Sequence, residues 1–138
     1  MKYYADKINS KNKKVANKYA DEWTLYEFSL CSIKYDPIKL EKSILKDKDT
    51  LAIAKLETYY FLNTCFVPNG YIMNNIDKIK NIPCFLIQGR FDMCTPVISA
   101  IDLKRKYGKN LHLHIVNSGH LSSDPEMFSA LKERIKKF

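Results

Sequence analysis

Apolar residues recur every three or four positions along the first half of the chain, which is the spacing of α-helices. One such pattern follows Ser10, a predicted N-cap, and continues to about residue 33. A second pattern begins near Asp47 or Asp49 and ends near Asn63. The first half of the chain is therefore expected to consist mainly of two helices.

Each helical pattern places a carboxylate on its apolar face. The first face consists of Ala16, Ala20, Trp23, Glu27 and Leu30, and the second of Thr50, Ala54, Glu57 and Phe61. A carboxylate without a partner is costly in such surroundings, so Glu27 and Glu57 are expected to bind a cation. The alternative is an ion pair with a nearby lysine, such as Lys18 or Lys55, on a solvated face.

The second half of the chain has a different pattern, which begins after the turn signal Pro68–Gly70. A continuous apolar run at Cys84–Ile87 follows a proline and predicts a buried, parallel strand. The alternating segment Leu111–Val116 predicts a second strand. We therefore expect an α/β arrangement of parallel strands with flanking helices in residues 69–138, and a separate helical portion in residues 1–68.

Two further helices are expected beside these strands. Thr95 is the predicted N-cap of the first, with Pro96 at its first helical position, and this helix ends at Gly108. Asp124 is the predicted cap of the last helix. The expected buried face of that helix consists of Phe128, Leu131, Ile135 and Phe138.

Asp92 and His120 each follow the end of a predicted strand. Functional groups in parallel sheets gather at the carboxyl ends of the strands, so the two side chains are expected to meet there. A carboxylate that accepts one ring N–H of a histidine fixes its tautomer and stabilises the imidazolium form, as a catalytic base requires. The alternatives are a loop carboxylate that caps the next helix and a surface histidine in a turn. Because both residues follow strand ends, catalytic roles are favoured.

Composition and charge exclude several classes of function. The chain carries 23 basic and 15 acidic residues, and its net charge is +8. The lysines are spread along the sequence and arginines are few, so solvated faces are favoured over a nucleic-acid surface. The sequence shows no apolar run of membrane-spanning length and no signal peptide, so no membrane association is expected.

The four cysteines are Cys31, Cys65, Cys84 and Cys94. None of them forms a C-x-x-C pair, so the sequence predicts no metal site, no cofactor and no disulfide framework. A reducing, cytoplasmic compartment is expected on the same ground. Cys94 is an alternative nucleophile because it lies near a predicted helix N-terminus, but it shares the loop of Asp92 and does not sit on a strained turn.

Four segments match, in order, the motifs of one enzyme family. Trp23–Glu27 resembles W-x-x-W-E, and Ala54–Phe61 resembles A-x-I-E-x-H-Y-F. Ile82–Asp92 resembles I-P-x-x-x-V-x-G-R-Y-D, and Ser118–Pro125 resembles an ending of the form G-H-S-x-x-E-P. The chain thus resembles the proline iminopeptidases, serine exopeptidases that release an N-terminal proline from peptides. It departs from their pattern at Cys94, which stands one place earlier than the cysteine that the family often has.

The resemblance implies the C-terminal portion of an α/β-hydrolase fold, preceded by helices of its cap domain. It implies that Asp92 and His120 are the acid and the base of a Ser-His-Asp triad. It further implies that Glu27 and Glu57 bind the N-terminal amine of a peptide substrate that begins with proline.

The nucleophile of such a triad is missing from the chain. No serine lies in a G-x-S-x-G turn and no glycine-rich oxyanion loop is present, so these parts are expected before residue 1 and the chain alone is expected to be inactive. An α/β-hydrolase of the esterase or epoxide hydrolase type fits Asp92 and His120 equally well. However, its neutral substrates would give Glu27 and Glu57 no cation to bind. A third interpretation is a non-catalytic interaction module, whose unpaired strand edge favours a homodimer or a domain swap.

Overall fold

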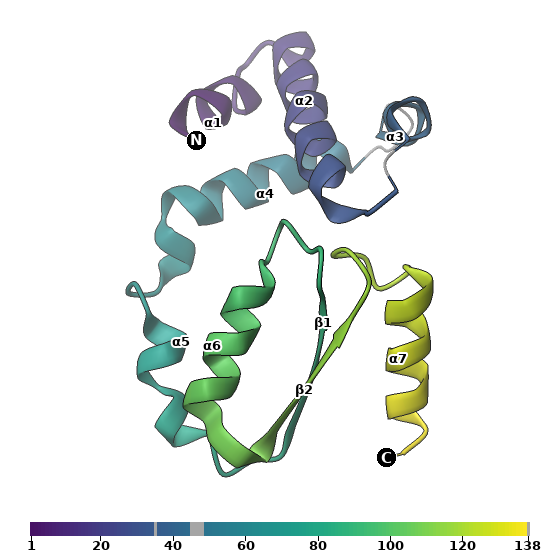
Figure 1. Cartoon of the computed structure of the whole chain (residues 1–138). Helices are drawn as coiled ribbons and strands as arrows, with labels where there is room; N and C mark the ends of the chain where they lie inside the picture. Colours follow the sequence, from purple (N-terminus) through teal and green to yellow (C-terminus); the bar gives the residue numbers. More distant parts are fainter. Residues whose placement is uncertain (35, 45–48, 138) are drawn as a thin grey trace. The chain divides into compact units, whose positions relative to one another are not determined.

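The computed structural model describes residues 1–34, 36–44 and 49–137 (Figure 1). The chain forms two compact units. The first unit comprises Met1–Ser29 and Tyr35–Asn69, and the second comprises Leu30–Lys34 and Gly70–Phe138. A short segment from the middle of the helical half therefore belongs to the unit that carries the strands.

The first unit is helical. Its elements are α1 (Lys2–Ile8), α2 (Lys13–Cys31, whose end belongs to the second unit), α3 (Pro37–Ile44), α4 (Thr50–Leu62) and a 3₁₀ turn at Thr64–Phe66. The expectation of two helices was therefore wrong, because α1 and α3 are too short for an apolar period to be visible.

The predicted N-cap of α2 was also wrong. The side chain of Asn12, and not that of Ser10, accepts the backbone N–H groups of Lys14 and Val15, at 3.0 and 3.4 Å. For α4, Asp49 occupies the N-cap position, as one of the two predictions had it. The other predicted cap, Asp47, lies outside the described residues.

The core of the first unit lies where α1, α2 and α4 meet. Ile8, Ala20 and Ala54 are buried there, and partly buried aromatic side chains such as Trp23 pack against them. The predicted face of α4 is correct at Thr50 and Ala54. It is wrong at Phe61, which is 47% exposed, whereas Thr58 is fully buried one turn after Ala54. The hydroxyl of Thr58 is accommodated because it donates to the Ala54 carbonyl oxygen at 2.7 Å.

The second unit contains the expected pair of strands. Its elements are α5 (Tyr71–Asn74), a 3₁₀ turn at Ile76–Lys78, β1 (Cys84–Gly89), α6 (Val97–Tyr107), a 3₁₀ turn at Gly108–Asn110, β2 (Leu111–Val116) and α7 (Pro125–Ile135). The strands β1 and β2 are parallel, and their register runs from Cys84 opposite Leu111 to Gly89 opposite Val116. Within the described residues the sheet has these two strands. The predicted α/β arrangement of parallel strands with flanking helices is thus confirmed.

Helices α6 and α7 cover opposite faces of the strand pair (Figure 1). On the α6 face, Tyr107 and Leu111 are buried with Leu86 beside them. On the α7 face, Val116 packs against Met127 and Ala130, with Ile87 and Leu131 at the margin. Successive strand residues alternate between these two clusters, as the pleat of a strand requires.

The expected buried face of α7 was wrong. Phe128 is 59% exposed and Ile135 is 70% exposed, and Phe138 lies outside the described residues. Met127 and Ala130 are buried instead. The helix offers two apolar stripes about one residue apart, and the stripe that carries the small Ala130 is the one that packs against Val116.

Candidate functional site

Asp92 lies in the loop that leaves the carboxyl end of β1, and its side chain is buried. Its Oδ1 atom accepts the backbone N–H groups of Cys94 and Thr95 at 2.9 and 2.8 Å. Its Oδ2 atom accepts the hydroxyl of Thr95 at 2.7 Å and the side-chain amide of Gln88 at 3.2 Å. The carboxylate therefore organises the loop on which it lies.

His120 lies in the turn that follows β2, and it reaches Asp92 across the ends of the two strands. Its Nδ1 atom is 2.9 Å from Oδ2 of Asp92. The histidine side chain is 41% exposed, whereas that of Asp92 is 4% exposed. The expected meeting of the two side chains is thus present, with a buried acid anchoring an accessible imidazole ring.

Opposing effects act on the pKa of Asp92. Burial alone raises this pKa, but the hydrogen bonds from the Thr95 backbone, the His120 ring and the Thr95 hydroxyl together hold it below its ordinary value. The carboxyl group is therefore an anion at neutral pH. An anion at this position accepts the Nδ1 hydrogen of the ring and leaves Nε2 available as a base.

Two glycines allow the loops of this site to approach one another. A Cβ atom on Gly89 would lie 2.0 Å from the carbonyl oxygen of Gly119, and a Cβ atom on Gly119 would lie 2.4 Å from that of Cys31. Across these close contacts, Phe91 N–H donates to the Ser118 carbonyl at 3.0 Å, and His120 N–H donates to the Cys31 carbonyl at 2.7 Å. The segment 30–34 thus supports the turn that carries His120.

Asp124 supports the same turn from its other side. Its Oδ2 atom accepts the Ser118 hydroxyl at 2.9 Å and the Gly119 N–H at 2.8 Å. Asp124 occupies the N-cap position of α7, as predicted, but its side chain makes no capping hydrogen bond with this helix. The carboxylate that was expected to cap a helix therefore positions the histidine turn.

The predicted cap of α6 was wrong. This helix begins at Val97 with Pro96 at the N-cap position, so Thr95 lies in the preceding loop. There the Thr95 hydroxyl donates to Asp92 and lies 3.4 Å from Nδ1 of His120. Thr95 is thus part of the hydrogen-bond network around the acid.

Glu27 and Glu57 belong to the first unit, and both are half-buried. Oε2 of Glu57 accepts the indole N–H of Trp23 at 2.9 Å. Lys18 was considered as an ion-pair partner for these glutamates, but its Nζ atom lies 3.9 Å from Oε1 of Glu22. Trp23 therefore orients the Glu57 carboxylate by this hydrogen bond, and the Trp23 ring also packs near Phe61, with the two ring centroids 6.4 Å apart.

Sequence reasoning missed a pair of thiols beside Asp92 and His120. The sulfur atoms of Cys31 and Cys94 are 3.4 Å apart, although the residues are 63 positions apart in the sequence. Single ligand atoms of Asp92, Cys94 and His120 lie within 4.8 Å of one another. A search for C-x-x-C spacing finds only local pairs, and these residues come from three separate segments.

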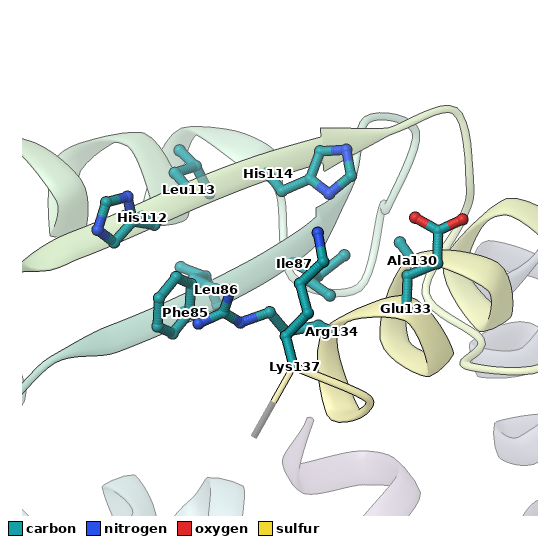
Figure 2. A pocket seen from close by; sticks show the side chains of 10 residues that line it. All are labelled: Phe85, Leu86, Ile87, His112, Leu113, His114, Ala130, Glu133, Arg134 and Lys137. Carbon is teal, nitrogen blue, oxygen red and sulfur yellow. The ribbon is translucent and has the colours of Figure 1, made fainter.

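A hollow of about 230 Å³ lies on the sheet face beside α7, and Figure 2 shows the side chains that line it. Phe85 and His112, which are opposite each other in the strand register, stack there with centroids 4.8 Å apart. The guanidinium of Arg134 lies over the Phe85 ring. Neither Asp92 nor His120 lines the hollow.

Among the described helices, none has the length and hydrophobicity of a bilayer-spanning segment.

Several curated proteins that are similar to the chain carry the name proline iminopeptidase. A proline iminopeptidase of Arabidopsis thaliana is 30% identical over 129 residues, which are 93% of this chain and 34% of that protein. A proline iminopeptidase of Neisseria gonorrhoeae is 35% identical over 118 residues, which are 85% of this chain and 36% of that protein. The chain is a partial-length homologue of the proline iminopeptidases.

A putative proline iminopeptidase of Mycoplasma pneumoniae is 31% identical over 137 residues, which are 97% of this chain and 43% of that protein. The chain thus spans between 34% and 43% of the length of these proline iminopeptidases. No family model matches the chain. The similarity to proline iminopeptidases confirms the resemblance that the four sequence motifs predicted.

Proposed function

We propose that the chain supplies the acid and the base of a proline iminopeptidase that works by Ser-His-Asp catalysis on an α/β-hydrolase fold. The observation that carries this proposal is the 2.9 Å contact between Asp92 and His120 at the carboxyl ends of adjacent parallel strands. Active groups of parallel sheets occur at this edge. The names of the relatives add the class of reaction, the release of an N-terminal proline.

In the proposed mechanism, the exposed side of the His120 ring takes a proton from a serine hydroxyl as that serine attacks the peptide carbonyl. The ring then returns the proton to the leaving amine. Asp92 holds the ring in the required tautomer and stabilises its charged form, and its lowered pKa keeps it ionised for this task. The hydrogen bonds from Cys94 and Thr95 keep the carboxylate in position.

We place the serine and the oxyanion donors in the part of the relatives' length that this chain does not span. The chain contains no G-x-S-x-G turn, and its four glycines lie at Gly70, Gly89, Gly108 and Gly119. In this proposal residues 69–138 form the C-terminal part of the hydrolase core and residues 1–68 form part of a helical cap.

Glu27 and Glu57 are proposed to bind the positively charged amine of the substrate's first residue. Glu57 supports this role because its carboxylate is half-buried and oriented by Trp23. A cation beside such a carboxylate recovers the electrostatic stabilisation that burial removes. A neutral ester or epoxide offers no such cation, so these two glutamates favour a peptidase over the other hydrolases of this fold.

A chimeric enzyme tests the proposal. The segment of the Neisseria gonorrhoeae proline iminopeptidase that matches this chain is replaced by the corresponding residues of this chain. We expect the chimera to hydrolyse a fluorogenic prolyl coumarin amide. Asp92→Asn and His120→Gln are each expected to lower kcat by about 10³–10⁴-fold. His120→Gln removes the base that takes the serine proton, and Asp92→Asn removes the carboxylate that holds His120 in the required tautomer. His114→Gln, at an exposed strand histidine, is the matched control and should retain activity.

The same chimera distinguishes a peptidase from an esterase. Replacing both glutamates, in the Glu27→Gln and Glu57→Gln double variant, should raise KM for the prolyl amide by about 10–100-fold, as for loss of a hydrogen bond to a charged group. Hydrolysis of a neutral acetate ester should change little. Equal effects on both substrates would reject the amine-binding role, and a folded chimera that is indifferent to His120→Gln would reject the catalytic proposal.

A further inference from the structure

The thiols of Cys31 and Cys94 are in contact within the second unit. Their sulfur atoms are 3.4 Å apart, although 63 positions separate the two residues in the sequence. Both residues are free cysteines in the structure. We propose that Cys31 and Cys94 form a reversible disulfide, which low-molecular-weight disulfides such as oxidised glutathione generate and reducing thiols cleave.

The thiol pair and the disulfide differ little in the positions of their atoms. A disulfide bond is about 2.05 Å long, so the two sulfur atoms have to approach each other by about 1.4 Å. Rotation of the two side chains about their Cα–Cβ bonds can supply this approach. Since the thiols already touch, their effective concentration toward each other is high, which favours an internal disulfide over one between molecules.

The backbone of each cysteine is held next to the Asp92–His120 pair. The carbonyl oxygen of Cys31 accepts the His120 N–H at 2.7 Å, and the N–H of Cys94 donates to Oδ1 of Asp92 at 2.9 Å. Both hydrogen bonds use backbone groups of the cysteines, and the 2.9 Å contact between Asp92 and His120 uses neither sulfur atom. The sulfur atoms can therefore join while these three contacts remain in place.

Burial sets the order in which the two thiols react. Cys94 is half-buried and Cys31 is buried, so an oxidant in solution reaches Cys94 first. The Cys94 thiolate attacks one sulfur of oxidised glutathione, forms a mixed disulfide and expels one glutathione thiolate. The Cys31 thiolate then attacks the Cys94 sulfur and expels the second glutathione. Two protein thiols thus lose two electrons and two protons, and one glutathione disulfide is reduced to two thiols.

The disulfide would fasten segment 30–34, which supports the His120 turn, to the loop that carries Asp92. A covalent link between segments so far apart in the sequence restricts the unfolded chain and thereby stabilises the fold. This inference goes beyond the proposed function, because it needs neither a nucleophile nor a substrate. It is tested on the 138-residue chain itself, so an inactive chimera would not affect it.

The test maps the disulfides of the purified chain. The reduced chain is incubated with oxidised glutathione at about pH 8, where a cysteine is partly ionised, and remaining thiols are blocked with N-ethylmaleimide. The monomer is isolated and digested with trypsin, which places Cys31 in peptide 19–34 and Cys94 in peptide 91–104. Mass spectrometry should show these two peptides joined at least about 10-fold more often than any other pair of cysteine peptides. Dithiothreitol should separate them.

Two controls show whether the fold selects this pair. The same incubation in concentrated urea should lower the yield of the joined peptides by about 10-fold or more, because unfolding removes the contact between the thiols. Cys65→Ser is the matched variant, because Cys65 is an exposed thiol of the first unit, and it should leave the yield unchanged. Cys94→Ser should abolish the link and leave Cys31 as a thiol.

Three results would each overturn the inference. The first is a folded chain in which Cys94 carries glutathione while Cys31 remains a thiol. The second is an equal yield of the joined peptides in urea. The third is preferred pairing of either residue with Cys65 or Cys84. The decisive map comes from the unmutated chain, so it does not depend on the folding of any variant.

Discussion

Asp92 links the stability of the second unit to the charge of a single carboxyl group. Its oxygens accept hydrogen bonds from Gln88, Cys94, Thr95 and His120. Because the net effect lowers the pKa of Asp92 in the folded chain, its ionised form stabilises the fold. This contribution is present above the unfolded-state pKa of about 3.9 and is lost as the pH falls from there through the lower folded-state pKa.

We therefore predict that Asp92→Asn lowers the free energy of unfolding at pH 7 and that this difference shrinks below about pH 4. Urea unfolding followed by circular dichroism at a series of pH values measures it. Asp102→Asn is the control, since Asp102 forms an exposed ion pair with Arg105 and exposed pairs contribute little. A difference between wild type and Asp92→Asn that is as large at pH 3 as at pH 7 would contradict the prediction.

At the scale of residues, the sequence predicted the meeting of Asp92 and His120 but not the contacts that support it. Asp92 and His120 were found because each follows a strand, and strand ends are visible in the apolar pattern. The thiols of Cys31 and Cys94 meet although 63 positions separate them, and the hydrogen bond from Ser118 to Asp124 forms within an irregular turn. A periodic pattern of apolar residues reveals neither contact. The sequence predicted Asp124 as a helix cap, because an Asp-Pro pair often begins a helix, but its side chain makes no capping hydrogen bond and instead supports the turn that carries His120.

At the scale of elements, the long helices and both strands were predictable because each repeats an apolar period several times. The short helices α1 and α3 were not, since seven and eight residues hold too few apolar positions. The face of α7 that is buried against the sheet was predicted incorrectly. Its pattern allows two neighbouring stripes, and only the packing of Ala130 and Met127 against the sheet decides between them.

The meeting of the β1 loop, the β2 turn and segment 30–34 depends on the space at Gly119. We predict that Gly119→Ala lowers the free energy of unfolding by about 3 kcal/mol or more, because the new Cβ overlaps a backbone oxygen that cannot rotate away. Chemical denaturation followed by circular dichroism measures this loss.

Gly70→Ala is the matched control for this prediction. Its nearest neighbour is the flexible Asn74 side chain at 3.4 Å, and its φ of +72° is left-handed. That substitution should cost only about 1–2 kcal/mol, the penalty of the left-handed conformation. A Gly119→Ala variant that is as stable as the wild type would show that the three segments are free to move apart.

At the scale of the whole molecule, the chain contains the proposed acid and base of a triad, but its sequence has no G-x-S-x-G serine for them to activate. We therefore predict that the purified 138-residue chain does not hydrolyse the prolyl coumarin amide. The complete Neisseria gonorrhoeae enzyme, assayed in parallel, shows that the substrate and conditions are adequate. Turnover by the chain that His120→Gln abolishes would instead place a nucleophile within it, and Cys94 would be the first residue to replace.

The sequence indicated a helical first portion and an α/β second portion from the change of apolar period near Pro68. It did not show that segment 30–34 belongs to the second unit. That membership rests on the fit of Cys31 against Gly119, and no feature of either residue alone reveals a contact between positions so far apart in the sequence.

This membership bears on how the protein can be dissected. The polypeptide enters the second unit at residue 30, leaves it after residue 34 and returns at residue 70. A truncation that begins at Gly70 would carry both Asp92 and His120 but would remove the carbonyl oxygen that accepts the His120 backbone N–H. The strand-bearing half is thus made of two separate stretches of the chain, and excising it with the His120 turn intact requires joining the Cys31 segment to it by a linker.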